Sequence, residues 1–407
     1  MILTALTKLA LRNLLRHRRR ALIAIFSVAL GTAALAVASG FIAGMFADFR
    51  EATIESQYAH LQITRPRYHE NGLADPDRYL LPDDAAAQTL RTVPHVRAWG
   101  PRLGLTGLVS HGESTLSFVG EGFDPAHDLT GDRSLTIVQG HRLGVADQNQ
   151  VLLGKGLATL MGVQAGDAVV VLVDTPASGL SAIDAKVAGV FESVSKAYDD
   201  SALLLHIDAA RKLLKVSGAH SWRVYVDETV HTPEVAAALR TRFDAARFEV
   251  RTWDQLAEFY TRAVDLFQQQ LDVVRFIVVA IILLGISNTM MMSVMERTGE
   301  IGTSMALGVR PRILLGQFLL EGALIGLLGS LAGLALAFMT GWGVDALRID
   351  MPPPPGLARG YLAHLSFTSA TVLEALLVGI GTTTLASLYP AWRASRLVIV
   401  DAIRHNK

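Results

Sequence analysis

The stretch that decides the fold is a short polar island between two apolar runs. Residues 296–312 read ERTGEIGTSMALGVRPR. The run before it, 276–295, contains no charged residue, and the run after it, 313–344, contains only Glu321. A membrane helix needs about 20 apolar residues, so each run is long enough to cross a bilayer. The sequence therefore predicts two membrane helices that this island joins on one side of the membrane.

The island itself predicts a short helix. Thr298 is a suitable N-cap, Glu300 lies in the first turn, Gly308 suits the end of the helix, and Pro311 suits the start of the next one. A solvated turn is the plainer alternative for a loop of this length. The capping pattern favours a helix that lies outside the bilayer.

The composition indicates a membrane protein with a large polar portion. Of the 407 residues, 51% are hydrophobic and 18% are charged, and the mean hydropathy is +0.35. About a quarter of the residues in an ordinary soluble domain are charged, so this chain is too apolar to be one. The net charge is zero, which gives no support for a nucleic-acid partner, and none is expected. The absence of cysteine excludes disulfides, cysteine metal ligands and thiol chemistry.

The N-terminal region predicts a surface helix followed by the first span. Residues 1–20 place apolar side chains opposite basic ones at helical spacing, which is typical of a helix on the cytoplasmic membrane surface. A surface for docking a partner is the alternative. Residues 21–46 are uncharged and long enough to be the first membrane helix. Ala36 and Ala38 also fit a signal-peptide cleavage site, but the apolar run continues past them, so we expect this segment to be retained.

Residues 47–272 have ordinary polar composition and predict an α+β domain on the outer side of the membrane. Strand and helix patterns alternate along it, which favours a mixed fold. From about 253 an apolar stripe continues without Gly or Pro into the second span, 273–295. A continuous helix from Trp253 to Met295 would be a stalk about 65 Å long. The expected strands are 58–64, 114–119, 168–173, 186–191, 202–206 and 222–226, and the expected helices are 83–92, 208–215 and 233–243.

The rest of the chain predicts two further spans. The third span, 313–344, carries glycines in steps of three or four residues, which let helices approach closely. A proline-rich outer loop follows at 345–367, then the fourth span at 368–390 and a basic tail at 391–407. The two ends of the chain and the polar island are rich in Lys and Arg, and the outer loop holds few. The positive-inside rule therefore places both termini and the island in the cytoplasm.

No catalytic or metal-binding motif is present. The histidines follow no HExxH or paired-ligand spacing, so we expect no metal site, and no Ser/His/Asp arrangement can be inferred. Gly154 and Lys155 lack the first glycine and the Ser or Thr of a Walker A motif. An autonomous enzyme is therefore not expected, and no cofactor is expected on this chain.

Three motifs together resemble the FtsX/MacB superfamily of type VII ABC transporter permeases. They are Asn288-Thr289-Met290, then residues 296–302, and then Ala306-Leu307-Gly308. The resemblance implies four membrane helices with a MacB-like periplasmic core domain between the first two. It also implies that the island is the coupling helix, which docks on a cytoplasmic ATPase dimer that uses ATP and Mg²⁺. Residues 59–63, AHLQI, resemble the lipoprotein-releasing LolC/LolE-like subgroup.

Three sets of residues are candidates for function. The resemblance implies an ATPase-coupling set: Arg297, Glu300, Ile301, Gly302, Ala306, Leu307 and Gly308. Polar groups within spans are functional candidates, for which bonding within the bundle or anchoring of the loop is the favoured role: Asn288 and Glu321. A candidate wall, which would contact the substrate or a second chain, is apolar: Met45, Phe46, Phe49, Phe259, Leu266 and Phe267.

The resemblance implies a permease subunit of the bacterial inner membrane, with its large domain in the periplasm. It would work by mechanotransmission, extruding or releasing a lipoprotein or lipid-like substrate. A second permease chain, membrane lipids and a periplasmic carrier or lipoprotein are the further partners expected. Two alternatives remain: an FtsX-like signal relay that controls an extracytoplasmic hydrolase, and MacB-like export of a peptide or drug through an outer-membrane partner.

Overall fold

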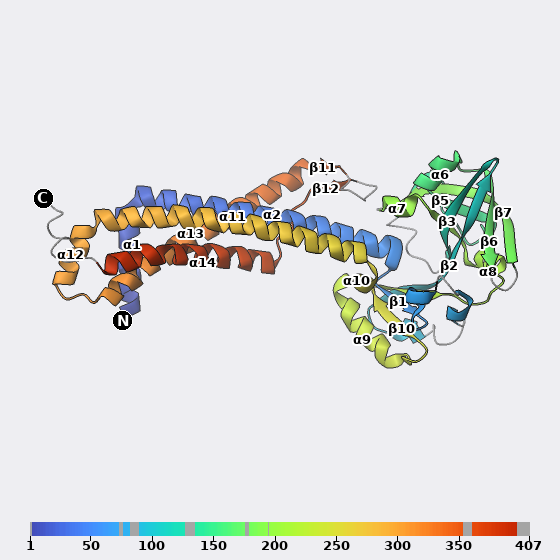
Figure 1. The fold of residues 1–407 in the computed structure, drawn as a ribbon, viewed down its shortest axis with the longest axis horizontal. Coiled ribbons are helices and arrows are strands. Elements are labelled where there is room, and N and C mark those ends of the chain that lie inside the picture. The colour runs from blue at the N-terminus through green and yellow to red at the C-terminus, as the bar shows by residue number, and fades with distance from the viewer. Residues whose placement is uncertain are drawn as a thin grey trace. The chain divides into compact units, whose positions relative to one another are not determined.

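The computed structural model describes residues 2–72, 76–81, 89–126, 135–175, 179–193, 195–352 and 360–396. The chain forms two compact units (Figure 1). The helical unit comprises residues 1–46, 263–350 and 362–407, and the sheet unit comprises 47–262 and 351–361. Most of the proline-rich segment and the end of the basic tail lie outside the described residues.

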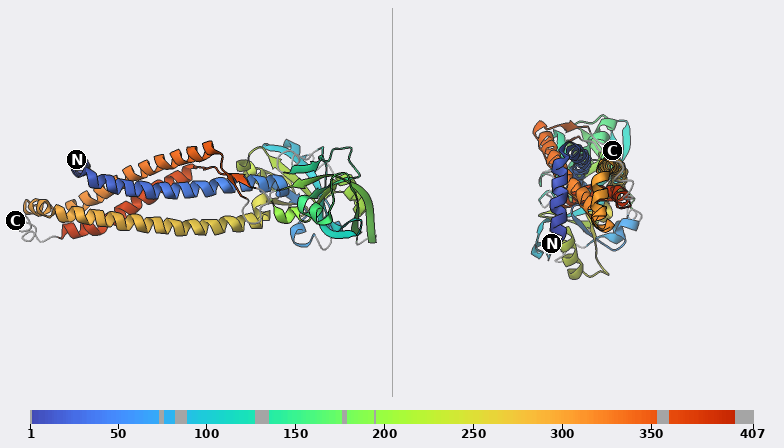
Figure 2. Two further views of the ribbon diagram at one scale, coloured as in Figure 1. Left: turned by 90° about the horizontal axis from the view of Figure 1, so that it is seen from above. Right: turned by 90° about the vertical axis from the view of Figure 1, so that its left-hand side faces the viewer.

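Four helices of the described chain are long and apolar enough to cross a membrane, which confirms the predicted fold class. They are α2 (Arg18–Thr53), α11 (Glu258–Glu296), α13 (Pro311–Leu347) and α14 (Ser369–Ser395). Within the helical unit they run side by side (Figure 2). Helix α2 continues as a π-helical turn to Tyr58, and both α2 and α11 contribute residues to each unit. The predicted ends of the spans within these helices stay predictions.

Glycines on α13 allow the close helix packing that their spacing predicts. A Cβ added at Gly322 would lie 1.9 Å from Ser387 Oγ on α14. A Cβ at Gly333 would lie 2.6 Å from the Ala29 carbonyl oxygen on α2. One helix therefore uses successive glycines to contact two neighbours, and dispersion contacts between the backbones replace side-chain packing.

Two predicted helix boundaries are wrong. Helix α1 covers Ile2–Arg16 rather than residues 1–20, and Arg18–Arg20 begin α2. Leu14 of α1 is buried against α2 and α11, so α1 packs on the bundle through this side chain. The stalk begins at Glu258 rather than near 253. A capping box begins the separate short helix α10 (Trp253–Leu256), and Ala257 then leaves helical geometry, so α10 and α11 are two helices. At 1.5 Å per residue, the 39 residues of α11 span about 58 Å.

The sheet unit contains a closed ring of strands. Strands pair in the order β2-β3-β8-β5-β7-β6, and β6 pairs with β2 again. Alternate side chains of these strands point into one core that contains Phe118 and Leu153, and α6 and α8 add to it. The ring has no free edge between these six strands. Their bounds are β2 Val96–His111, β3 Ser114–Phe123, β5 Gln150–Gly154, β6 Ala168–Thr175, β7 Gly179–Glu192 and β8 Ala202–His206.

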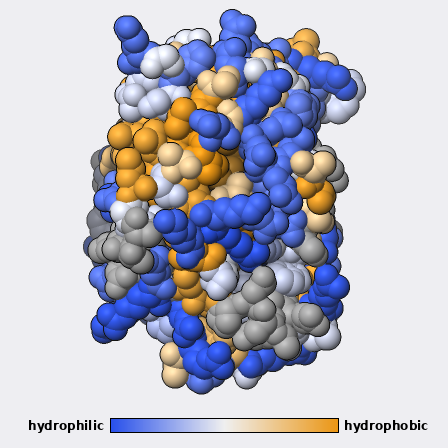
Figure 3. All heavy atoms as spheres, turned by 90° about the vertical axis from the view of Figure 1, so that its right-hand side faces the viewer, coloured by the Kyte–Doolittle hydropathy of each residue, from blue (hydrophilic) through white to orange (hydrophobic). Residues whose placement is uncertain are grey.

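A second lobe extends from the ring through β2. Here the antiparallel order is β10-β1-β9-β2, and helix α9 buries its apolar side chains in a separate core around Trp222. The face of the sheet unit seen in Figure 3 is mostly hydrophilic, with an apolar area among the polar residues.

The remaining strands and helices of the sheet unit have these bounds: β1 Leu61–Thr64, β4 Thr136–Gly140, β9 Ser221–Val226, β10 Glu249–Thr252, α3 Tyr68–Asn71, α6 Lys155–Met161, α7 Lys196–Asp199, α8 Ile207–Leu214 and α9 Thr232–Arg242.

Strand β2 joins the two lobes and was missed in the sequence. Its first half pairs with β9, and its second half pairs with β3 and β6. Where the lobes meet, Glu121 accepts a hydrogen bond from Arg223 and lies 3.7 Å from Arg102, both of which are buried. Buried cations need such a partner, because an unpaired charge in the interior is costly. The predicted helix 83–92 falls mostly outside the described residues, and 89–92 form a 3₁₀ turn.

His60, in the motif after the first span, is buried as a neutral ring. Its Nδ1 accepts a hydrogen bond from the Val226 N–H at 3.3 Å, and its Nε2 lies 3.2 Å from Thr229 Oγ1. The Thr229 hydroxyl donates to Glu51 at 2.8 Å, so it accepts from His60. Burial lowers the pKa of His60 to about 4, because the charged ring would lose its hydration. The network connects the end of α2 to β9.

We expect Gly326→Ala to destabilise the helical unit by about 1–3 kcal/mol, the range for overpacking. The new Cβ would lie 2.1 Å from Thr383 Oγ1 and 3.0 Å from the Ile380 Cα, so the backbone of α14 must move. Gly316→Ala on the same helix is the control, because nothing lies within 4 Å of its added Cβ. Thermal unfolding in detergent checks this, and equal midpoints for the two variants would contradict it.

We expect the sheet unit to lose stability as the pH falls from about 6.5 to about 4. The folded-state pKa of His60 is about 4, below the ordinary value of about 6.5, so the unfolded state binds a proton first. Its contribution is complete above pH 6.5 and is lost as the pH approaches 4. Tryptophan fluorescence during unfolding at several pH values measures this loss.

His60→Gln should flatten the acid dependence, because Gln has no proton to gain in this range. His141→Gln is the control, since the His141 side chain is 63% exposed. If His60→Gln retains the full acid loss, the assignment of the neutral ring is wrong.

Candidate functional site

The polar island folds as helix α12 (Thr298–Ala306), and its first turn differs from the prediction. Arg297 occupies the N-cap position, without a side-chain cap. The Thr298 hydroxyl donates instead to the Val294 and Met295 carbonyl oxygens, at 3.1 and 2.7 Å. Thr298 is therefore not the cap; it satisfies acceptors at the end of α11 that the helix leaves free. The turn between α11 and α12 is thus tight and internally bonded.

The end of α12 follows the sequence pattern. The Leu307 and Gly308 N–H groups donate to the Thr303 and Met305 carbonyl oxygens, at 3.1 and 3.0 Å. Gly308 has φ +91°, a left-handed conformation that glycine adopts without a steric penalty. Pro311 then lies in the first turn of α13, where its missing N–H is not needed. These two residues set the direction in which the chain returns to the bundle.

One face of α12 is buried against the membrane helices. Ile301 is 4% exposed and packs in a cluster with Val294 of α11, Leu314 and Phe318 of α13, and Ala391 of α14. Burying an Ile side chain contributes about 1.5–3 kcal/mol, which favours one fixed placement of this short helix. A displacement of α12 would therefore move the ends of three membrane helices with it.

Arg297 and Glu321 form a buried ion pair at this junction. Arg297 Nη1 lies 3.4 Å from Glu321 Oε2, and both side chains are less than one tenth exposed. The guanidinium also lies over the Phe318 ring, 5.5 Å from its centroid, and 3.7 Å from Glu300. The predicted role of Glu321, within the bundle or as an anchor of the loop, stays a prediction. The pair connects the start of α12 to a position about three turns into α13.

Two further ion pairs join this region to the N-terminal helices. Arg16 of α1 lies 3.0 Å from Glu300, and Arg20 of α2 makes a two-pronged contact with Glu296 at the end of α11. Sequence reasoning missed both, because residues 284 and 276 positions apart give no local signal. These surface pairs contribute little stability individually. The first joins α1 to α12, and the second joins the start of α2 to the end of α11.

The structure divides the predicted ATPase-coupling set into two groups. Arg297, Ile301 and Gly302 are buried in the single chain. The others are exposed, and Leu307 at the tip is 83% exposed, an unusual state for a large apolar side chain. The exposed members are Glu300, Ala306, Leu307 and Gly308.

The remaining polar groups within the helices are placed differently from the prediction. Asn288 is exposed on α11, whereas the neighbouring Ser287 hydroxyl donates to the Ala386 carbonyl oxygen of α14 at 2.8 Å. The interhelical bond expected of Asn288 in the single chain is therefore made by Ser287. Glu374 of α14 pairs with Arg275 of α11.

The candidate wall consists mainly of contacts between α2 and α11. Phe46 packs edge-on against Phe267 with ring centroids 5.3 Å apart, and Phe49 packs on Phe259 at 6.2 Å. These aromatic pairs join the two helices. Phe259 and Leu266 nevertheless stay more than half exposed, and Met45 is half-buried.

Comparison with known proteins identifies two matching regions. Residues 273–399 match the family described as FtsX-like permease C-terminal, and residues 21–242 match the MacB-like periplasmic core domain. The chain is similar to the lipoprotein-releasing system transmembrane protein LolC of Xylella fastidiosa, with 23% identity over 270 residues. That alignment covers 63% of this chain and 65% of LolC, so the chain spans just under two thirds of this relative.

One further relative and one solved structure are similar to parts of this chain. The macrolide export ATP-binding/permease protein MacB of Hyphomonas neptunium is 30% identical over 227 residues, which are 54% of this chain and 33% of that protein. The solved periplasmic region of MacB from Actinobacillus actinomycetemcomitans aligns with 51% of this chain and 94% of that chain, at 14% identity and a TM-score of 0.36.

We expect Arg297→Met to destabilise the helical unit by about 3–5 kcal/mol, the range for breaking a buried ion pair. Glu321 would be left buried beside Phe318 without its cation. The double variant Arg297→Met with Glu321→Leu should be more stable than either single variant, because no unpaired charge remains. Thermal unfolding of the three variants in detergent measures the coupling. Additive losses in the double variant would show that the pair does not interact.

Proposed function

This chain belongs to the FtsX/MacB superfamily of ABC transporter permeases, and we propose that it is the non-catalytic permease subunit of a transporter that couples to a separate cytoplasmic ATPase. The 407 residues contain no Walker A motif, which supports an ATPase on another chain. We propose a location in the bacterial inner membrane, and the positive-inside pattern supports an orientation with the sheet unit on the periplasmic side.

Helix α12 carries this proposal. The buried face of α12 packs on the bundle. Leu307 directly follows the end of α12, between Ala306 and Gly308, and its side chain is 83% exposed. An exposed large apolar side chain on a rigid, short helix is suited to a groove of a partner protein. Gly308 beside it allows the partner to approach the backbone closely. Leu307 is therefore the proposed anchor in the ATPase, and Glu300 a polar contact at the margin.

Movement of α12 would reach the membrane helices through contacts that resist bending. Ile301 packs on the ends of α11, α13 and α14, and the Arg297–Glu321 pair adds a charged connection to α13. Helix α11 continues without interruption from α12 back to Glu258, in the sheet unit. Closure of two ATPase subunits on ATP binding would thus be passed along α11 to the outer domain. We call this transfer of movement along α11 mechanotransmission. In this mechanism no substrate needs to cross a central pore.

A second permease chain completes the proposed assembly. Asn288 and Thr289 lie in the span of α11, and Asn288 is exposed in the single chain although polar groups in lipid are costly. A neighbouring permease in the membrane would remove that cost by offering a hydrogen-bond partner. Two permease chains above two ATPase subunits would also give each α12 its own docking site.

The proposed substrate is a lipoprotein or another lipid-like molecule of the outer leaflet. Similarity to LolC, whose name describes a lipoprotein-releasing system, supports this class. The exposed apolar side chains Phe259 and Leu266 on α11 would contact the acyl chains. A periplasmic carrier would then receive the product. Export of a small molecule is the second candidate, because the MacB relative has the higher identity, 30%.

Reconstitution tests the proposal. Proteoliposomes that contain this chain and the ATPase with which it copurifies should release a triacylated lipoprotein when ATP is added. Leu307→Asp should reduce both release and permease-dependent ATPase activity by at least about tenfold, since a charge replaces the anchor in an apolar groove and costs more than about 1.4 kcal/mol.

Leu160→Asp in α6 is the matched control, because Leu160 is a leucine of similar exposure, 68%, in the sheet unit. It should keep normal release. Normal coupling in Leu307→Asp would contradict the docking assignment. Transport of a macrolide with no release of lipoprotein would favour the export alternative.

A further inference from the structure

A cluster of two histidines and one aspartate lies outside the site described above. His95 precedes β2, and Asp227 follows β9. These strands pair with Val96 opposite Val226, and the Asp227 N–H donates to the His95 carbonyl oxygen at 3.0 Å. His231 ends the 3₁₀ turn that follows, and its N–H donates to the Glu228 carbonyl oxygen at 3.0 Å. Sheet register and one turn thus bring the three side chains together within the sheet unit.

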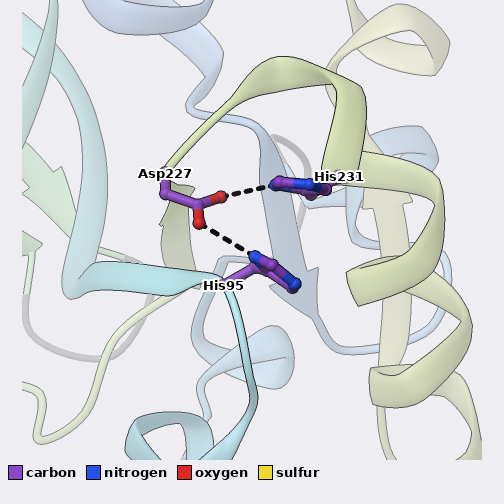
Figure 4. Close-up of side chains that lie close together, drawn as sticks. All are labelled: His95, Asp227 and His231. Carbon is purple, nitrogen blue, oxygen red and sulfur yellow. Dashed lines mark hydrogen bonds and ion pairs between the residues drawn. The ribbon is translucent and has the colours of Figure 1, made fainter.

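The ligand atoms of the cluster converge on one point. Asp227 Oδ2 lies 2.8 Å from His95 Nδ1, and Oδ1 lies 2.8 Å from His231 Nδ1. Figure 4 shows both rings directed at the carboxylate. The rings stack with centroids 3.9 Å apart at 30°, and one ligand atom from each of the three residues lies within 4.8 Å of the others. Side-chain exposures of 35%, 47% and 29% leave the cluster open to solvent.

The electrostatics of the cluster favour a cation. The Asp227 carboxylate accepts hydrogen bonds from both rings, and the carboxylates of Glu228 and Glu234 add negative charge nearby. A divalent cation held by the two rings and Asp227 would balance this charge.

The backbone at His95 points to a constrained site. His95 has φ +65°, a left-handed conformation that costs a non-glycine residue about 1–2 kcal/mol. The strand pairing with β9 holds it there, and this conformation directs the ring at Asp227. Such outliers gather at ligand sites, where the surrounding structure maintains them.

We propose that His95, Asp227 and His231 bind a divalent first-row transition metal ion, such as Zn²⁺, with water at the remaining positions. Two imidazoles and one carboxylate are a usual ligand set for such ions, and a site of oxygen ligands would be needed for Ca²⁺ or Mg²⁺. Tetrahedral Zn²⁺ with ligands at about 2.0–2.1 Å separates neighbouring ligand atoms by about 3.3 Å. The two 2.8 Å contacts would open by about half an ångström, and ligand atoms that lie farther apart, within 4.8 Å, would draw together.

The ion would connect β2 with the loop that precedes α9. Without the ion, hydrogen bonds from the two rings to Asp227 make this connection. Replacing the protons with a metal ion stabilises the folded state by mass action, since the unfolded chain has no such site. The expectation that this chain has no metal site rested on spacing along the sequence. It missed the i,i+4 pair Asp227 and His231, and the strand register that adds His95.

Zinc titration of the full chain tests the site. The protein is purified in detergent without a polyhistidine tag, stripped with a chelator, and titrated with ZnCl₂ against a chromophoric chelator. Wild type should bind one equivalent more than His95→Ala, His231→Ala or Asp227→Asn. Loss of a direct ligand should weaken this site by at least about 100-fold, the upper end of the effect of losing a supporting residue. Zinc should also raise the unfolding midpoint of wild type more than that of these variants.

His141→Ala is the matched control, since His141 is an exposed histidine whose Nε2 lies 3.8 Å from one aspartate, Asp147, alone. It should bind zinc as wild type does. Visible absorption of bound Co²⁺ in wild type, absent from His95→Ala, would identify nitrogen ligation independently. Circular dichroism of the metal-free variants shows whether they are folded. Equal zinc stoichiometry in wild type and in the folded variants would overturn the proposal.

Discussion

The buried ion pair between Arg297 and Glu321 is the constraint on which the α12 end of the helical unit depends. A charge inside a helical bundle is tolerated only with a partner, so Glu321 on α13 requires Arg297, and Arg297 determines where α12 begins. Ile301 then buries the adjacent turn among the ends of α11, α13 and α14. The island between two membrane helices is therefore a rigid extension of the bundle, with one exposed apolar tip at Leu307.

The rest of the helical unit follows from the need to satisfy polar groups and to pack backbones in an apolar environment. Glycines on α13 bring α2 and α14 close enough for dispersion contacts to act between backbones. The Ser287 hydroxyl donates to a carbonyl oxygen of α14, and Arg275 pairs with Glu374. The sheet unit must bury apolar cores of its own, because water surrounds it. Its closed ring buries one core and removes strand edges, and β2 carries the chain on into a second core.

The sequence predicted those helices and strands that follow from the hydrophobic pattern of neighbouring residues. Long uncharged runs give α2, α11, α13 and α14, alternation gives strands such as β3, and a short apolar run gives β8, because hydrophobic period and length are properties of neighbouring residues. Strand β2 was not predicted, since Pro101 and three glycines interrupt its pattern, and pairing with β3, β6 and β9 outweighs that interruption. The stalk was placed too early, because the stripe from Trp253 gives no sign of the break at Ala257.

The sequence by itself determined the membrane class, the α+β outer domain and the short helix of residues 298–306, because composition, periodicity and capping act over a few residues. Only the tertiary structure decided which side chains of that helix are free. Arg297 and Ile301 differ from Leu307 in burial, and burial depends on distant residues such as Glu321 and Ala391. The same reason applies to His95, Asp227 and His231. Strand pairing, which sums many contacts across the chain, brings them together, and no spacing along the sequence records it.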